Sequence, residues 1–256
     1  MVWQTYQLLL HTSPSGNLMG FVFFATVCSY NFHWFLTPFS ISYSQRLAWA
    51  HQHKGWHLFL YFVGLIGTLV FFLFIREHWL ALGFGAFITF LYSAPKLPLP
   101  AFRSLKEIAV GKTIFLSVVW AYVTAALPFF IENQPWKFEY IQYVLNRFML
   151  IYSICILFDY RDRGDDKKEG IRSMITYLDE KGINLLFGIS MLLFFISTWC
   201  LKFYGHSYRD LVLLAIPGII TAILYPYAKK NFSDYLYYFV LDGLMMLSGL
   251  LMLIFN

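Results

Sequence analysis

The chain has 256 residues, of which 59% are hydrophobic, 21% aromatic and only 13% charged. A water-soluble domain carries about twice that share of charged residues, so the composition excludes an ordinary soluble globular protein. The net charge is +5. The basic residues lie mainly in short connections between apolar runs, where they suit anionic membrane lipids, so the charge gives no indication of nucleic-acid binding.

Eight apolar runs follow one another along the chain, and each is long enough to cross about 30 Å of hydrocarbon as a helix. No connection between them exceeds 24 residues, which leaves no room for a soluble domain. We therefore predict an all-α fold, a polytopic bundle of transmembrane helices that forms a single domain over residues 1–256. The expected spans are residues 18–36, 56–75, 79–95, 113–131, 140–158, 183–201, 210–228 and 235–255.

The first ten residues, MVWQTYQLLL, are apolar but too short to cross a membrane. They also lack the basic flank of a cleaved signal peptide. We expect a partial N-terminal segment in front of the eight full spans, similar to the last turns of an incomplete helix.

The distribution of Lys and Arg predicts which face of the membrane each connection occupies. Alternate connections hold fourteen basic residues on one side and four on the other, and Arg147 lies within a span. The side with fourteen is expected in the cytoplasm, and it includes the aspartate-rich stretch that follows residue 158. We therefore expect an integral, multi-pass protein of a bacterial plasma membrane with this stretch on the cytoplasmic side.

A tyrosine and a lysine end the third expected span, in the sequence YSAPK, where Tyr92 and Lys96 are four residues apart. A lysine at the membrane boundary can bind an anionic phosphate group. Alternatively, Lys96 serves only as an anchor whose ammonium group reaches the lipid headgroups. The two residues lie on the predicted cytoplasmic side, together with the aspartate-rich stretch.

Residues 157–174, LFDYRDRGDDKKEGIRSM, place four aspartates within eight positions, directly after an apolar run. On a helix, Asp159, Asp162 and Asp166 fall within an arc of about 60°. Three carboxylates on one face repel one another unless a cation lies between them, and oxygen ligands suit Mg²⁺ or Ca²⁺. The alternative is a solvated segment whose acids are neutralised by the six basic residues of the same connection.

One further carboxylate, Asp242, lies about a third of the way into the last expected span, in YYFVLDGLMML. A carboxylate in the hydrocarbon is costly and is usually functional or paired. Two roles stay open, namely positioning of a substrate and pairing with a basic group. Arg147, near the opposite membrane face, is expected to be structural.

Two of these stretches carry a resemblance to a known family. DYRDRGDDKKEGIRS resembles the second aspartate-rich motif, DxxDxxxD, of the UbiA-type intramembrane prenyltransferases, and YSAPK resembles their YxxxK motif. The resemblance implies a UbiA-like helical bundle and Mg²⁺-dependent transfer of an isoprenyl group from an isoprenyl diphosphate to a lipophilic, often aromatic acceptor. It implies Asp159, Asp162 and Asp166 as the catalytic, Mg²⁺-binding residues, and Lys96 and Tyr92 as the diphosphate site.

The chain departs from this family at its first aspartate-rich motif, NDxxDxxxD. The matching residues 31–39 read NFHWFLTPF, in which Asn31 remains as a candidate substrate-binding residue but Phe32, Phe35 and Phe39 replace the aspartates. One possibility is a prenyltransferase with a single metal cluster. The alternative is a catalytically degenerate UbiA-like protein that binds an isoprenoid or supports a membrane complex. A transporter is less favoured, because no internal repeat of broken helices is found.

Overall fold

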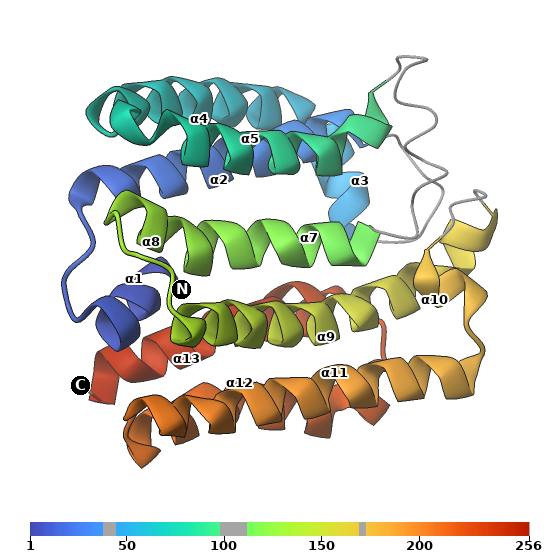
Figure 1. Ribbon diagram of the computed structural model, residues 1–256. Coiled ribbons are helices and arrows are strands. Elements are labelled where there is room, and N and C mark those ends of the chain that lie inside the picture. The colour runs from blue at the N-terminus through green and yellow to red at the C-terminus, as the bar shows by residue number, and fades with distance from the viewer. Residues whose placement is uncertain (38–44, 98–111, 169–172, 256) are drawn as a thin grey trace. The chain divides into compact units, whose positions relative to one another are not determined.

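The computed structural model describes residues 1–37, 45–97, 112–168 and 173–255, all of which form helices, turns and short connections (Figure 1). The chain divides into two compact units, and each is described by itself. Unit 1 comprises Met1–Ser13 and Ala109–Asn256, and unit 2 comprises Pro14–Ile108. The single domain expected over residues 1–256 stays a prediction.

Seven helices of the described residues are long and apolar enough to cross a membrane, and each overlaps one of the expected spans. The predicted all-α, multi-pass architecture is therefore confirmed at this level. The eighth expected span, residues 79–95, corresponds to α5 (Trp79–Ser93) and a short 3-10 turn. The 15 residues of α5 extend about 22 Å at 1.5 Å per residue, which is less than the hydrocarbon thickness. Eight full spans stay a prediction.

Unit 2 is held together by close packing of two long helices across glycines. A Cβ atom on Gly64 would lie 2.5 Å from the backbone nitrogen of Cys28, and one on Gly67 would lie 2.3 Å from the ring of Phe24. The absence of side chains at these glycines therefore lets the two helices approach closely. The helical elements of unit 2 are α2 (Gly16–Leu36), α3 (Gln45–Gln52), α4 (Lys54–Phe74), η2 (Arg76–His78), α5 and η3 (Ala94–Lys96).

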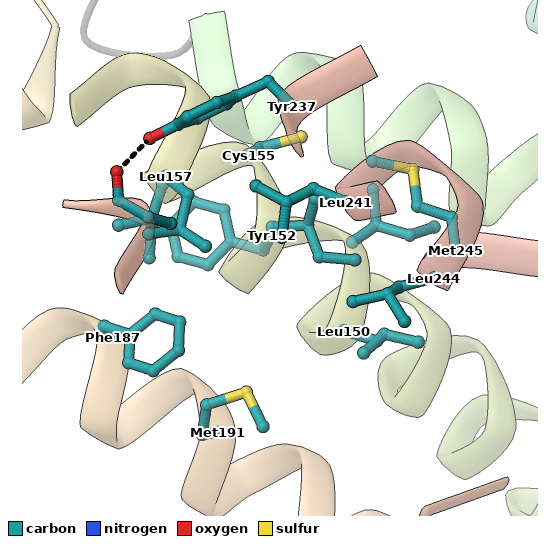
Figure 2. Close-up of a cluster of buried hydrophobic side chains, with 14 of the residues drawn as sticks. Leu150, Tyr152, Cys155, Leu157, Phe187, Met191, Tyr237, Leu241, Leu244 and Met245 are labelled. Atoms are coloured by element: carbon teal, nitrogen blue, oxygen red, sulfur yellow. Dashed lines mark hydrogen bonds between the residues drawn. The ribbon is translucent and has the colours of Figure 1, made fainter. Parts of the chain in front are cut away.

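Unit 1 is built around α9 (Phe138–Lys168), whose residues 150–157 are almost fully buried. Figure 2 shows Leu150, Tyr152, Cys155 and Leu157 of this helix among side chains of α11 and of the chain's last helical segment. The other helical elements of unit 1 are α1 (Val2–Thr5), η1 (Tyr6–Leu10), α7 (Lys112–Ala121), η5 (Tyr122–Ala126), α8 (Leu127–Ile131), α10 (Met174–Tyr177), α11 (Glu180–Cys200), η6 (Leu201–Tyr204), α12 (Tyr208–Ala228), η7 (Leu236–Leu241) and α13 (Asp242–Phe255).

The partial N-terminal segment is helical and packs on the rest of unit 1 at Arg147, a fully buried cation with 1% exposure. Arg147 donates hydrogen bonds to Asn146 Oδ1 at 2.6 and 3.0 Å, to Ser248 Oγ at 2.9 Å and to Gln4 Oε1 at 3.5 Å. Asn146 Nδ2 in turn donates to Thr198 Oγ1 at 2.7 Å. This network joins α1, α9, α11 and α13 and confirms the structural role expected for Arg147.

The glycine contact of unit 2 gives a matched test. We predict that Gly64→Ala lowers the free energy of unfolding by about 1–3 kcal/mol, because the added methyl group meets backbone atoms of α2. Gly83→Ala is the control, since a Cβ at that helical position meets no atom within 4 Å. It should leave stability unchanged or raise it by up to about 1 kcal/mol. Thermal unfolding in detergent measures both, and equal stability of the two variants would contradict the close packing.

Candidate functional site

The aspartate-rich stretch is helical. α9 does not end at residue 158, where the apolar run ends, but continues to Lys168. Arg163 of this extension donates to the Leu178 carbonyl oxygen at 2.5 Å, and Lys168 pairs with Asp165 at 3.2 Å. Because the helix is continuous, the arc of Asp159, Asp162 and Asp166 expected from the sequence is present in the structure.

Two of these three carboxylates are buried. Asp159 is only 4% exposed and accepts a hydrogen bond from the Thr113 hydroxyl at the start of α7. The position of Thr113 is supported by Ser117, whose hydroxyl donates to the Thr113 carbonyl oxygen at 2.8 Å. Asp166, two turns further along α9, is 6% exposed. Carboxylates are seldom buried to this extent, so Asp159 and Asp166 are the candidate functional residues of this helix.

Asp162 has a different environment, although it shares the arc. Its carboxylate is 38% exposed and accepts a hydrogen bond from Arg161 Nε at 2.8 Å. This ion pair neutralises part of the charge that was expected to attract a metal. Asp165, which falls outside the arc, is 50% exposed and pairs with Lys168, as expected for a solvated position.

Arg161 lies in an aromatic cradle that the sequence analysis missed. Its guanidinium carbon lies 5.3 Å from the ring centre of Phe158, 4.8 Å from that of Tyr237 and 4.7 Å from that of Tyr238. Arg161 Nη2 also donates to the Tyr238 hydroxyl at 2.8 Å. These cation–π contacts fix the polar end of α9 against η7. In the sequence, only the three-residue spacing of Phe158 and Arg161 hints at the cradle.

Glu180, the first residue of α11, joins this helix to α9 and to the end of α12. Its carboxylate accepts from Arg163 Nη1 at 3.3 Å, from Lys229 Nζ at 2.6 Å and from the Tyr160 hydroxyl at 3.0 Å. Glu180 is half exposed to solvent, so each ion pair contributes at most about 1 kcal/mol. Arg163 therefore pairs with Glu180 at the start of α11.

In unit 2, the lysine and tyrosine of YSAPK meet at a histidine. Lys96 Nζ lies 2.7 Å from His33 Nε2 and donates to Thr37 Oγ1 at 2.6 Å. The Tyr92 ring stacks on the His33 ring, with centroids 5.0 Å apart and an interplanar angle of 14°. Tyr92 and Lys96 thus have His33 as a common neighbour, and their role as a diphosphate site stays a prediction.

Asn31 and Phe32, which begin the departing motif, face α4. Asn31 Nδ2 donates to the Val27 carbonyl oxygen at 2.7 Å, and Asn31 Oδ1 lies 2.8 Å from His57 Nδ1. Phe32 packs on Tyr61, with ring centroids 5.4 Å apart. These contacts join α2 to α4, so both residues contribute to packing within unit 2. Phe39 lies outside the described residues.

Asp242 is the first residue of α13 and directly follows the π-helical turns of η7. It is half-buried, and its neighbours Leu241 and Leu244 belong to the apolar cluster around α9. Asp242 therefore lies in unit 1, as do Asp159, Asp162 and Asp166. Its role in substrate binding stays a prediction.

The acidic side chains of α9 are the candidate ligands for the expected Mg²⁺. Within the described ranges, no group of three or more His, Cys, Asp or Glu side chains is placed to hold a metal ion. Mg²⁺ is nevertheless often bound by one or two carboxylates, with water and substrate phosphate completing its shell. Asp159 and Asp166 are carboxylates of the kind used in that mode, and the Mg²⁺ site stays a prediction.

The aromatic cradle can be tested by stability. We predict that Arg161→Leu lowers the free energy of unfolding by about 2 kcal/mol, because it removes both the cation–π contacts and the bond to Tyr238. Lys167→Leu, at an exposed position of the same helix, should change it by about 0.5 kcal/mol or less. Thermal unfolding in detergent compares the two, and a neutral Arg161→Leu would show that the cradle does not hold α9.

Comparisons of the chain with protein-family models, with curated proteins and with solved structures find no match. The resemblance to the UbiA-type prenyltransferases is therefore carried by the two motifs and their order alone, and it stays a hypothesis.

Proposed function

We propose that this protein transfers an isoprenyl group from an isoprenyl diphosphate to a lipophilic acceptor within the membrane, in a Mg²⁺-dependent reaction. The observation that carries the proposal is the burial of Asp159 and Asp166 on one face of α9, at 4% and 6% exposure. Carboxylate oxygens are ligands that Mg²⁺ uses in proteins, often one or two of them together with water and substrate phosphate, so a divalent ion that also binds diphosphate suits this face.

The proposed roles follow from the contacts of each side chain. Asp159, oriented by Thr113, and Asp166 would hold Mg²⁺. Mg²⁺, when bound, supplies charge neutralisation for the diphosphate leaving group. Asp162, held by Arg161, is the outer carboxylate of the same arc. Lys96 with Tyr92 would bind the diphosphate, while Asn31 and Asp242 stay candidate substrate contacts.

Lys96 and Thr113 lie on either side of one connection of the chain. α5 leads through residues 97–111 into α7, whose Thr113 contacts Asp159. If α5 and α7 both cross the membrane, Lys96 and Thr113 belong to the same membrane face. The excess of basic residues in the connections on that side favours the cytoplasmic face of a bacterial plasma membrane.

A specific observation favours a second function. Where the UbiA pattern has its first aspartates, Phe32 packs on Tyr61 and Asn31 bonds to α2 and α4, while Asp162 is paired with Arg161. These contacts suit a catalytically degenerate protein that binds an isoprenoid without converting it. The two functions differ in turnover and not in binding.

Metal-dependent binding gives the test. We predict that Asp159→Asn and Asp166→Asn each weaken Mg²⁺-dependent binding of labelled geranyl or farnesyl diphosphate by roughly 10- to 100-fold. Asp165→Asn is the matched control, because Asp165 is exposed and lies outside the arc. It should bind like the wild type. Binding is measured on purified protein in nanodiscs, with and without Mg²⁺.

The outcomes separate the candidates. Equal binding by wild type, Asp159→Asn and Asp166→Asn would remove the metal site. Binding that depends on Mg²⁺, with labelled product formed from a lipophilic acceptor, supports the transferase. The same binding without product for any acceptor or chain length supports the degenerate protein.

A further inference from the structure

Two cavities adjoin the turn that connects α11 to α12, at the end of unit 1 away from the aspartate-rich stretch. α11 begins at Glu180, which bonds to Arg163 of that stretch, and its 21 residues extend about 31 Å at 1.5 Å per residue. The start of α9 and the end of α13 lie at the same end of unit 1 as this turn (Figure 1). A ligand bound here is therefore separate from the proposed carboxylate site.

The first cavity is an apolar groove of about 510 Å³ between the end of α11 and the start of α12. Its volume is within the range of about 300–1,000 Å³ that is usual for ligand sites. The rings of Trp199 and Tyr208 line the groove with centroids 6.4 Å apart, and the two side chains are well exposed. Both residue types are common at the boundary between hydrocarbon and water, so the groove suits the acyl chain of a lipid. Its lining also includes Phe195, Ile196, Leu211 and Ala215.

The second cavity, of about 400 Å³, is polar and is lined by two carboxylates. Glu139 of α9 accepts a hydrogen bond from His206 Nε2 at 2.8 Å. Asp210 of α12 accepts from the Ser207 hydroxyl at 2.6 Å. The side chains of Glu139 and Asp210 are 21% and 22% exposed. An ionised carboxylate offers about four acceptor sites, so both groups can also accept hydrogen bonds from a ligand with N–H donors.

Lys202 lies at the boundary between the two cavities. Its ammonium group donates to the carbonyl oxygen of His206, which lines the polar cavity, at 3.2 Å. The same group lies 4.1 Å from the ring centre of Tyr208, which lines the apolar groove. A lysine ammonium group has three donors, and neither of these contacts is with an anion. Lys202 thus presents a cation between an apolar region and an acidic region.

The order of these features matches the order of groups in a phospholipid with an amine headgroup. We propose that this end of unit 1 binds a phospholipid whose headgroup is ethanolamine. Its acyl chain lies in the groove, its phosphate accepts from Lys202, and its ammonium group donates to Glu139 and Asp210. A choline headgroup has no N–H group and a glycerol headgroup has no cation, so neither makes the same contacts. The site does not depend on the proposed prenyl transfer.

Three substitutions each affect one part of the lipid. Glu139→Gln keeps an oxygen that can accept from His206 but removes the charge that attracts the ammonium group. Lys202→Met keeps an unbranched side chain beside the Tyr208 ring but removes the cation. Ala215→Phe fills part of the groove.

Two further substitutions are matched controls. Lys137→Met removes another lysine beside a tyrosine ring, since Lys137 Nζ lies 5.4 Å from the ring centre of Tyr140. Ile223→Phe enlarges an exposed side chain of α12. Neither Lys137 nor Ile223 lines the groove or the polar cavity.

Binding is measured on the full chain, purified in dodecyl maltoside, by titration with phospholipids whose acyl chains carry bromine. Bromine quenches nearby tryptophan fluorescence, and Trp199 lines the groove. Its contribution is the difference between each protein and the same protein carrying Trp199→Phe. Phosphatidylethanolamine, phosphatidylcholine and phosphatidylglycerol are compared, and thermal unfolding checks that every variant is folded.

We expect the wild type to bind phosphatidylethanolamine about tenfold more tightly than the other two lipids, because charge-assisted hydrogen bonds to the ammonium group are added. Glu139→Gln should remove this preference and leave the other two affinities within about threefold. Lys202→Met and Ala215→Phe should weaken all three lipids about fivefold, because phosphate and acyl chain are common to them. Both controls should match the wild type within about twofold.

Two results would overturn the proposal. Equal affinities for the three lipids, unchanged by Glu139→Gln, or tightest binding of phosphatidylglycerol would show that the carboxylates do not select an ammonium group. Wild-type affinities in both Lys202→Met and Ala215→Phe would show that the lipid does not occupy this groove.

Discussion

The burial of Asp159 and Asp166 is the constraint on which the rest of unit 1 depends. An ionised carboxylate removed from water loses much of its hydration, and two such groups on one helical face also repel each other. The surrounding elements hold this face in position. Thr113 of α7 donates to Asp159, the aromatic cradle holds Arg161 against η7, and Glu180 joins α9 to α11 and α12. Together these contacts fix the polar end of α9. A carboxylate pair must be held in position in this way if it is to bind a metal and a phosphate.

The proposed chemistry uses charged side chains that each unit holds by its own contacts. Unit 1 holds the buried carboxylates, which are proposed to bind a divalent cation, and in unit 2 Lys96 is held by His33 and Thr37. A diphosphate carries enough negative charge to engage both a metal ion and an ammonium group. The predominantly apolar helices around these groups would keep water away from a reactive isoprenyl cation. Arg147 is fully buried in the same apolar setting, and its acceptors are polar side chains of the helices that it joins. These hydrogen bonds give Arg147 a structural role.

Hydrophobic run length predicted the helices well, since seven of the expected spans overlap apolar helices of the described residues. Helical periodicity also predicted the arc of Asp159, Asp162 and Asp166, because an arc depends on one helix only. What periodicity could not predict is which side chain of one helix meets which side chain of another. His33 and Lys96 are 63 residues apart, and Arg161 and Tyr238 are 77 residues apart. The expected span ends with the apolar run at residue 158, whereas α9 continues to Lys168 because its last turns are stabilised by ion pairs and by contacts with α10 and α11 rather than by apolar residues.

The central claim is that the α9 carboxylates bind a divalent ion that is shared with a diphosphate. Electron paramagnetic resonance with Mn²⁺ in place of Mg²⁺ measures this directly on purified protein in nanodiscs with geranyl diphosphate. The account predicts a bound Mn²⁺ whose spectrum shows hyperfine coupling to phosphorus, and it predicts that Asp166→Asn removes both the bound ion and the coupling. Bound Mn²⁺ without phosphorus coupling, or coupling that persists in Asp166→Asn, would contradict it.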